Sequence, residues 1–164
     1  MAKAYIVYPG LGKTTLVRKN KLFADIEAKP FKDLSLAEYI GKPEYPNVRG
    51  LPVKELNPEY PRNMYDYARA EIAAGKILLL VPKQDSFGML DELGIKDFSF
   101  IMPDRERLKQ LEQDYTGRGD DPEYIRKNIN ERYEQVLNLA RELGKEIIFV
   151  KPDEYLENII KDIK

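Results

Sequence analysis

The sequence contains no cysteine, no histidine and no tryptophan. Without cysteine and histidine, the chain cannot form disulfides, thiolate nucleophiles, Cys/His zinc sites, histidine-ligated haem or a histidine-based catalytic triad. Any catalysis must therefore depend on carboxylates, lysine, arginine, hydroxyls, backbone amides and a hard metal ion. This inventory suits phosphoryl transfer, in which the protein mainly positions groups and neutralises charge.

Charge of either sign is not in excess, because 27 lysines and arginines stand against 28 aspartates and glutamates, for a net charge of −1. This balance argues against a uniformly basic nucleic-acid surface but is compatible with a local basic cleft. Long apolar runs are also missing: Ala4–Val7 is too short for a signal peptide or a membrane span, and Ile77–Val81 has the length of a strand. We expect a soluble, cytoplasmic protein with no membrane partner, whose 164 residues form one domain.

Three segments repeat one pattern: a helical stretch, a glycine, a short apolar run and a proline. Glycine just past a helix adopts the left-handed cap conformation at low cost, and proline stops a strand because it donates no hydrogen bond. Apolar runs without alternation, such as Ile77–Val81, indicate strands covered on both faces, as in a parallel sheet. Helices and strands therefore alternate, which predicts a three-layer α/β fold.

The same pattern gives the positions of the elements. About five strands are expected, at Ala4–Val7, Lys21–Ala24, Ile77–Val81, Phe98–Met102 and Ile147–Val150. Helical stretches are expected near 13–20, 58–74, 84–93, 104–114, 122–143 and 153–163. The helix over 122–143 has the strongest pattern, because Asp121-Pro122 supplies an N-cap and apolar residues recur at helical spacing up to Leu143. The proline-rich stretch 41–61 and the polar turn 116–121 are expected to be loops.

The most specific motif runs from the first apolar strand through a glycine-rich turn into a helix. In phosphate-binding loops, glycines let backbone N–H groups converge on phosphate oxygens, and the helix N-terminus adds further donors. The residues that would bind the nucleotide are Pro9, Gly10, Leu11, Gly12, Lys13, Thr14 and Thr15. Lys13 would reach the β- and γ-phosphates, and the Thr14 hydroxyl would ligate Mg²⁺. We therefore predict a nucleotide-phosphate site with ATP and Mg²⁺ as cofactors.

One position departs from the full motif. The pattern G-x-x-x-x-G-K-[ST] would place a glycine at position 7, where this chain has Val7. The loop therefore matches the second half of the pattern, and Gly10 supplies part of the conformational freedom.

Two classes of small P-loop protein are disfavoured by the sequence. A GTPase of this size carries Asn-Lys-x-Asp and Asp-x-x-Gly motifs after its strands, and neither follows the third or the fourth expected strand directly. A motor-type ATPase needs a Walker-B acid after an apolar strand, whereas Ile77–Val81 is followed by Pro82 and Lys83. Because these two classes are disfavoured, the kinases remain as the third class of small P-loop protein.

Basic residues favour a kinase in the segment 103–134. They surround the 116–121 turn and are Arg105, Arg107, Lys109, Arg118, Arg126, Lys127 and Arg132. Kinases that phosphorylate a small acceptor need cations over the triphosphate and a cover that excludes water, and a helical flap with arginines supplies both. The alternative is a solvated helical pair of mixed charge, since acidic residues are equally plentiful there.

Together these motifs resemble small phage-type P-loop nucleotide kinases, which are similar to adenylate and deoxynucleoside monophosphate kinases. The resemblance covers most of residues 1–140 and rests on Pro9–Thr14, Asp25 after a short strand, Met102–Arg105, Tyr115-x-x-Arg118-Gly119 and Pro122–Ile125. It implies a five-stranded parallel sheet in the order 2-3-1-4-5. It also implies an acceptor-side insert over about 30–60 and a lid over about 104–135, in which Arg105 and Arg118 would act as catalytic arginines.

The same resemblance places the acceptor site over residues 25–66. Asp25 would orient the acceptor or hold Mg²⁺, and the alternative is that it caps a short helix. Arg49 and Arg62 are candidates to bind an acceptor phosphate, because the guanidinium fork makes bidentate contacts. The alternative for both arginines is an ordinary surface charge. Asp85, after the third strand, is a further Mg²⁺ candidate.

The sequence thus predicts a Mg²⁺- and ATP-dependent kinase of a (deoxy)nucleoside monophosphate, whose partner is a small nucleotide. A second hypothesis changes the acceptor to a nucleic-acid end or a hydroxylated base in DNA. A third hypothesis is a nucleotide-binding module without catalysis, which the valine at position 7 favours. The sequence does not distinguish the base, the sugar or the oligomeric state.

Overall fold

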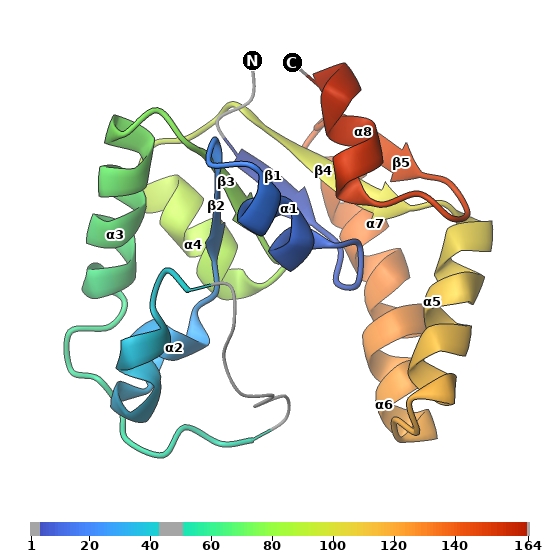
Figure 1. The fold of residues 1–164 in the computed structure, drawn as a ribbon, viewed down its shortest axis with the longest axis horizontal. Helices are drawn as coiled ribbons and strands as arrows, with labels where there is room; N and C mark the ends of the chain where they lie inside the picture. The colour runs from blue at the N-terminus through green and yellow to red at the C-terminus, as the bar shows by residue number, and fades with distance from the viewer. Residues whose placement is uncertain (1–3, 43–50, 164) are drawn as a thin grey trace. The chain divides into compact units, whose positions relative to one another are not determined.

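The computed structural model describes residues 4–42 and 51–163 (Figure 1). Contacts divide these residues into two compact units. The first unit comprises the described residues of 1–6 and 13–98, and the second comprises those of 7–12 and 99–164.

Five parallel strands form one sheet in the order β2-β3-β1-β4-β5. The strands are β1 (Ala4–Val7), β2 (Phe23–Ile26), β3 (Ile77–Leu80), β4 (Phe98–Pro103) and β5 (Ile147–Val150). This order confirms the α/β class and the sheet topology that the family resemblance implies. An all-parallel sheet needs helical crossovers, so the arrangement is consistent with three layers.

Eight α-helices lie in the described residues. In the first unit they are α1 (Lys13–Lys19), α2 (Lys29–Lys32), α3 (Arg62–Ala73) and α4 (Gln84–Glu92). In the second unit they are α5 (Arg105–Gly117), α6 (Pro122–Ile125), α7 (Arg132–Glu142) and α8 (Leu156–Ile163). A 3₁₀ helix (Leu34–Tyr39) follows α2, and a π-helical turn (Arg126–Glu131) joins α6 to α7. Across 4–42 and 51–163, no helix combines the length and the apolar character needed to cross a bilayer.

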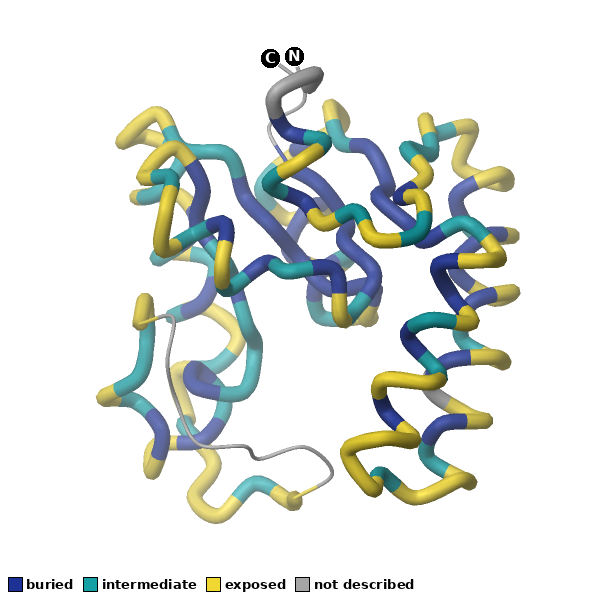
Figure 2. The backbone as a smooth tube through the Cα atoms, turned by 45° about the vertical axis from the view of Figure 1, so that its right-hand side comes forward, coloured by how far each residue is buried: buried dark blue, intermediate teal, exposed yellow. Residues whose placement is uncertain are grey.

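The central strands are buried along their length, as their uninterrupted apolar sequences predict. All four residues of β1 are buried, and Leu78, Leu79 and Leu80 of β3 have no solvent exposure. The longer helices instead alternate buried and exposed residues, as Figure 2 shows. The core therefore forms around β1 and β3, and β1 leads directly into the glycine-rich loop.

The second strand lies later in the sequence than expected, at Phe23–Ile26 instead of Lys21–Ala24. A turn delays it: the side-chain oxygen of Asn20 accepts a hydrogen bond from the Leu22 amide at 3.0 Å. Such side-chain mimicry of a backbone turn is typical of asparagine. Asp25 therefore lies inside the strand instead of following it, and it caps no helix.

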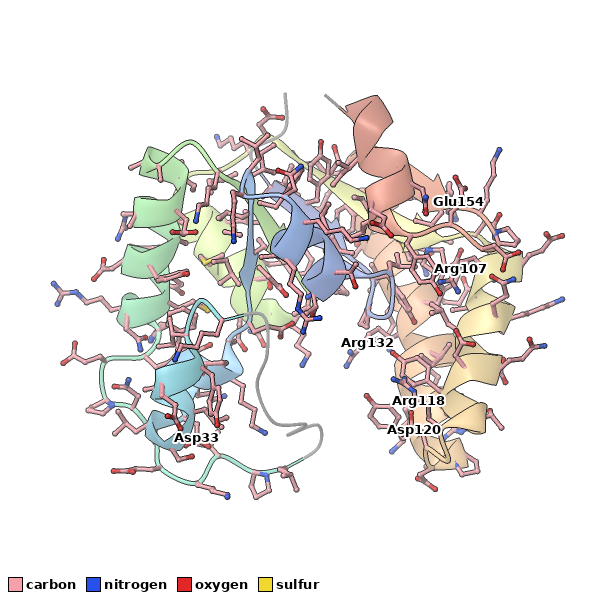
Figure 3. The ribbon with its side chains drawn as sticks, in the orientation of Figure 1. Asp33, Arg107, Arg118, Asp120, Arg132 and Glu154 are labelled. Carbon is pink, nitrogen blue, oxygen red and sulfur yellow. The ribbon has the colours of Figure 1, made fainter. Side chains whose placement is uncertain are left out.

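A buried carboxylate organises the segment after β2. Asp33 accepts hydrogen bonds from the amide and the hydroxyl of Ser35, and also from the amides of Lys54 and Glu55. These hydrogen bonds, with that from the Lys54 amide the largest contribution, lower the pKa of the Asp33 carboxyl to about 2. Neither α2 nor the 3₁₀ helix was predicted from the sequence, because tertiary hydrogen bonds fix them. Figure 3 labels Asp33 beside α2.

The second unit contains a pair of helices joined by a short turn. The predicted helix over 122–143 is confirmed as a continuous helical path, but it contains the π-helical turn between α6 and α7. Its buried apolar residues are Ile125, Ile129, Tyr133, Val136, Leu137 and Ala140. Leu143, expected on the same face, caps the end of α7 and is 46% exposed. The preceding helix, α5, runs to Gly117, three residues beyond its expected end, so the turn is shorter than predicted.

Candidate functional site

The glycine-rich loop turns twice through backbone conformations that favour glycine. Gly10 has φ 89° and Gly12 has φ 93°, both in the left-handed region. A Cβ atom on Gly10 would lie 2.9 Å from Cδ2 of Leu111, and one on Gly12 would lie 3.4 Å from Cδ1 of Tyr155. The backbone conformation therefore favours glycine at both positions, and at Gly10 an added Cβ would also displace the Leu111 side chain. The chain then enters α1 at Lys13.

The ammonium group of Lys13 is buried between two carboxylates. Its Nζ lies 3.2 Å from Oδ1 of Asp25 and 3.0 Å from Oε1 of Glu27, and it donates a hydrogen bond to each. The Lys13 side chain is 9% exposed and that of Asp25 is 15% exposed. A buried ammonium needs such partners, because an unpaired buried charge is costly. Of the predicted site residues in the described ranges, Lys13 and Asp25 are joined by direct contact.

The electrostatics of this cluster favour a charged lysine. Burial works against the charged form of Lys13, but the charges and hydrogen bonds of Asp25 and Glu27 outweigh burial and raise the pKa of the ammonium. Burial also raises the pKa of the Asp25 carboxyl, which Lys13 opposes and Glu27 reinforces. One cation and two carboxylates give the cluster an excess of negative charge, which attracts a further cation.

Glu27 is a site residue that the sequence analysis missed. It follows β2 directly and lies two residues after Asp25, so the two side chains share a face of the strand. The Asp-x-Glu spacing at the end of a strand was the available signal. Misplacing β2 by two residues hid it, because both acids then fell beyond the expected strand.

The donor set near the loop suits a hard divalent cation. Mg²⁺ is usually held by one or two carboxylates together with substrate phosphates and waters, so a complete cage of protein ligands is not needed. In the part of the chain that the structure describes, no group of three or more metal-ligating acids occurs. The Thr14 hydroxyl and the Asp25 carboxylate are oxygen donors of the kind Mg²⁺ prefers, and they fit this partial ligation.

The two predicted lid arginines are not brought together. Arg105 begins α5 and pairs with Glu134 at 2.7 Å, while Arg118 follows the helix and lies 3.6 Å from Asp120. The hydrogen bond and the charge of Glu134 raise the pKa of Arg105. At about 1.5 Å per residue, the two arginines lie about 20 Å apart along the helix axis. They therefore do not act on one phosphate in this conformation.

The other acceptor-site candidates lie apart from the Lys13 cluster or outside the described residues. Arg49 lies outside the described residues. Arg62 is the first residue of α3, 83% exposed, and 3.9 Å from Asp66. Asp85 lies in the first turn of α4 beside Tyr60, and burial together with the Asp85 carboxylate raises the pKa of that phenol. No contact described for Arg62 or Asp85 involves Lys13.

In the second unit, Arg107 was counted among basic residues without a specific role. The structure buries it to 2% exposure, with Nε 3.2 Å from the Glu154 carbonyl and the guanidinium 4.9 Å from the centre of the Tyr155 ring. Figure 3 shows Arg107 and Glu154 close together. Tyr8, next to the loop, donates from its hydroxyl to the Ile129 carbonyl at 2.6 Å. Neither contact could be predicted from the local sequence, because each joins segments that lie far apart along the chain.

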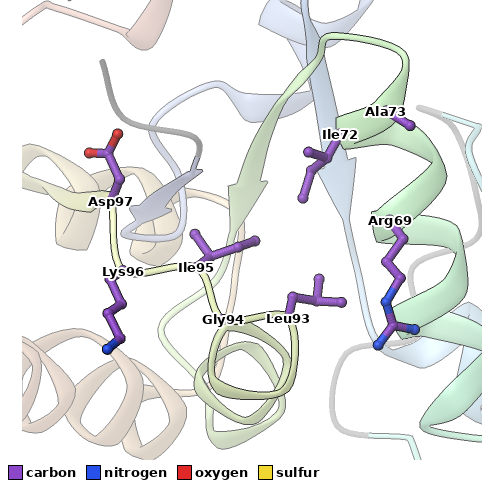
Figure 4. Close-up of a pocket in the computed structure, with 8 residues that line it drawn as sticks. All are labelled: Arg69, Ile72, Ala73, Leu93, Gly94, Ile95, Lys96 and Asp97. Carbon is purple, nitrogen blue, oxygen red and sulfur yellow. The ribbon is translucent and has the colours of Figure 1, made fainter.

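A surface pocket of about 550 Å³ lies in the first unit (Figure 4). It is lined by Arg69, Ile72 and Ala73 of α3 and by Leu93, Gly94, Ile95, Lys96 and Asp97 before β4. These residues precede β3 and β4, at the amino ends of the strands, whereas Asp25 and Glu27 lie at the carboxyl end of β2. None of the predicted site residues lines this pocket.

Comparison with known proteins found no family model that matches the chain, and no curated protein matches it. The functional assignment therefore depends on the geometry of the loop and of the Lys13 cluster.

Proposed function

We propose that this chain is a P-loop phosphotransferase that transfers the γ-phosphoryl group of Mg·ATP to a (deoxy)nucleoside monophosphate. One observation carries the proposal: the buried strand β1 leads through two glycines of positive φ into Lys13, a charged lysine buried beside two carboxylates. Glycines at these positions give the loop backbone its left-handed turns, and the lysine supplies the cation that phosphates require.

The nucleotide would be bound by residues 9–15. On binding, a phosphate oxygen replaces one of the carboxylate partners of Lys13, so the ammonium remains paired throughout. Asp25 and Thr14 would then hold Mg²⁺. The ion would neutralise charge on the β- and γ-phosphate oxygens. Lys13 stabilises the charge that develops on the same oxygens during transfer.

The acceptor phosphate would attack in line and needs no general base, because its oxygen is already deprotonated. A cation must offset its charge, and the exposed Arg62 is the candidate in the described residues. Arg105 and Arg118 lie at opposite ends of α5, so each would meet a different group of the bound nucleotides once the helical pair closes over them. Movements of this kind are common in kinases, where closure excludes water.

A second acceptor class is favoured by the paired acids beside Lys13. Asp25 and Glu27 would repel a phosphate dianion, whereas a hydroxyl acceptor needs a base to take its proton. Burial raises the pKa of Asp25, which moves it toward the range of a general base. A kinase of a hydroxyl group, on a nucleic-acid end or on a hydroxylated base, is therefore the second candidate.

Transfer of labelled γ-phosphate tests both candidates. The protein is incubated with Mg·ATP and a panel of ribo- and deoxyribonucleoside monophosphates, nucleosides, and DNA with hydroxyl ends or hydroxylated bases. Label in one monophosphate supports the first candidate, and label in DNA alone supports the second. ATP binding with an empty panel would instead indicate a binding module, and absence of ATP binding would contradict the phosphate site.

Matched lysine variants locate the activity. Lys13→Ala should lose transfer by at least about 100-fold, because preorganised charge stabilisation at a transferred group typically contributes this much. Lys19→Ala removes an exposed lysine from the last turn of the same helix and should retain activity. Equal turnover in the two variants would reject the assignment of Lys13.

A further inference from the structure

The glycine-rich loop is braced by the segment that joins β5 to α8. Cδ1 of Tyr155 would lie 3.4 Å from a Cβ on Gly12, so the ring packs against the bare glycine backbone. The amide of the next residue, Leu156, donates to the Leu11 carbonyl at 3.0 Å. These contacts fix one side of the loop immediately before Lys13. Neither Tyr155 nor Leu156 belongs to the glycine-rich motif of residues 9–15.

The Tyr155 ring is in turn held by α5. The Arg107 guanidinium stacks 4.9 Å from the ring centre, and its Nε donates to the carbonyl of Glu154 at 3.2 Å. Two further hydrogen bonds join α5 to the same segment. The Gln110 side chain donates to the Asp153 carboxylate and accepts from the Asp153 amide. The ring therefore lies between a fixed cation and the loop.

Burial makes the role of this arginine specific. Arg107 is 2% exposed, although an arginine in the first turn of a surface helix normally extends into solvent. A planar guanidinium both stacks on an aromatic face and donates in its own plane, which an ammonium cannot do. The two described contacts of its side chain are with Tyr155 and with the carbonyl of the residue before it, Glu154. Arg107 thus sets the position of Tyr155.

We propose that Arg107 and Tyr155 are positioning residues for the phosphate loop: Arg107 holds the Tyr155 ring against Gly12, and the ring keeps the loop in its phosphate-binding conformation before the nucleotide arrives. This inference rests on the proposed function, because it assumes that the loop binds phosphate. It predicts that loss of the ring weakens binding of the phosphate chain itself, independent of any base.

Three variants test the ring. Tyr155→Ala removes it, Tyr155→Phe keeps it, and Phe149→Ala removes an equally exposed ring, 45% against 43%, from the neighbouring strand β5. Calorimetry measures the affinity of each variant for Mg·ATP and for inorganic tripolyphosphate. Tyr155→Ala should lose about ten-fold for both ligands, equivalent to about 1.4 kcal/mol. Tyr155→Phe and Phe149→Ala should stay within about two-fold of the wild type.

The results separate three explanations. Weaker ATP binding with unchanged tripolyphosphate binding would overturn the proposal, because the ring would then act on the base. An equal loss in Phe149→Ala would overturn it as well, because the effect would be general destabilisation. If the wild type binds neither ligand, the proposed function itself fails. That outcome is distinguishable from a wild type that binds both ligands and a Tyr155→Ala variant that is unaffected.

A double-mutant cycle tests whether Arg107 acts through Tyr155. Arg107→Lys keeps the charge and loses the planar stacking, so the buried site retains a cation. Arg107→Lys alone should weaken tripolyphosphate binding about three-fold. Added to Tyr155→Ala, it should have no further effect, since coupled residues are non-additive. Additive losses would overturn the proposed order of action.

Hydrogen–deuterium exchange supplies a readout that needs no ligand. In the free protein, Tyr155→Ala should speed exchange in the peptide that covers residues 8–13, while exchange in α7 stays as in the wild type. Unchanged exchange over 8–13 would overturn the proposal, whatever the binding data show.

Discussion

Lys13 has a structural role that its position in a motif does not reveal. It holds two carboxylates, and Asp25 is itself largely buried. Lys13→Met should therefore lower the free energy of unfolding by about 3 kcal/mol at pH 7, because removing one partner of a buried pair leaves an uncompensated charge. Urea denaturation measures this loss. The double variant Lys13→Met/Asp25→Asn should recover part of it.

The loss should also depend on pH. Burial raises the pKa of Asp25, and without Lys13 nothing in the cluster opposes that shift. A carboxyl whose folded pKa exceeds its unfolded value of about 3.9 binds protons more readily in the folded state, so stability rises as pH falls. The difference between Lys13→Met and the wild type should shrink from pH 7 toward pH 4. A constant difference over this range would contradict the prediction.

The pKa of the Asp33 carboxyl is shifted in the opposite direction to that of Asp25. Its folded pKa of about 2 lies below the unfolded value, so its contribution to stability is present above about pH 4 and is lost as pH falls toward 2. Asp33→Asn should lower the melting temperature at pH 7 and lower it by clearly less at pH 2.5. Asp91→Asn, at an exposed position in the same unit, is the control and should change the melting temperature little at either pH. Calorimetric melting at both pH values tests this.

At the scale of elements, the glycine-rich loop offers a test of its two sources of constraint, backbone conformation and space. Gly10 needs both its positive φ and its space, since a Cβ would lie 2.9 Å from Leu111. Gly119 has a comparable φ of 81° but open space around it. Both alanine variants should lose about 1–2 kcal/mol for the left-handed backbone. Gly10→Ala should lose more, and only Gly10→Ala should weaken ATP binding; equal stability losses would contradict the close contact.

Other elements illustrate where local sequence is insufficient. The longest helix was predictable because its apolar residues keep helical spacing, and the strands were predictable because they are uninterrupted apolar runs. The start of β2 was not predictable, because a hydrogen bond from the Leu22 amide to Asn20 shifts it. The positions of α2 and of the 3₁₀ helix were not predictable either, because Asp33 fixes them through amides about twenty residues away.

For the candidate site, the sequence pointed to Lys13 and Asp25 but not to Glu27, which also contacts Lys13. Lys13 and Asp25 were both expected, and the structure joins them. Arg105 and Arg118 were both expected to be lid arginines, and the structure places them at opposite ends of α5, a separation that the sequence alone could have supplied. Arg107 and Tyr155 could not be found, because their contact joins segments that no local pattern relates.

At the scale of the whole molecule, charge limits how nucleic acid can bind. With a net charge of −1, any contact with DNA must come from a local basic region. A cleft that contacts two or three phosphates of a single strand gives a slope of about −2 for log K against log salt. We expect oligonucleotide binding, if DNA is the acceptor, to follow this shallow dependence. A slope steeper than about −5 would indicate an extensive basic surface and contradict the expectation.

The tyrosines that approach the loop make the protein its own optical probe. The chain has 11 tyrosines and no tryptophan, so its intrinsic fluorescence comes from phenol rings alone. Tyr115 lies beside Gly10 and Tyr155 lies beside Gly12. Each tyrosine would be within contact distance of a Cβ atom added to its own glycine. A polyanion bound in the proposed phosphate loop would change the surroundings of both rings. The emission of the unlabelled protein would then follow the proposed nucleotide binding in real time, without the energy transfer to indole that hides tyrosine signals in most proteins.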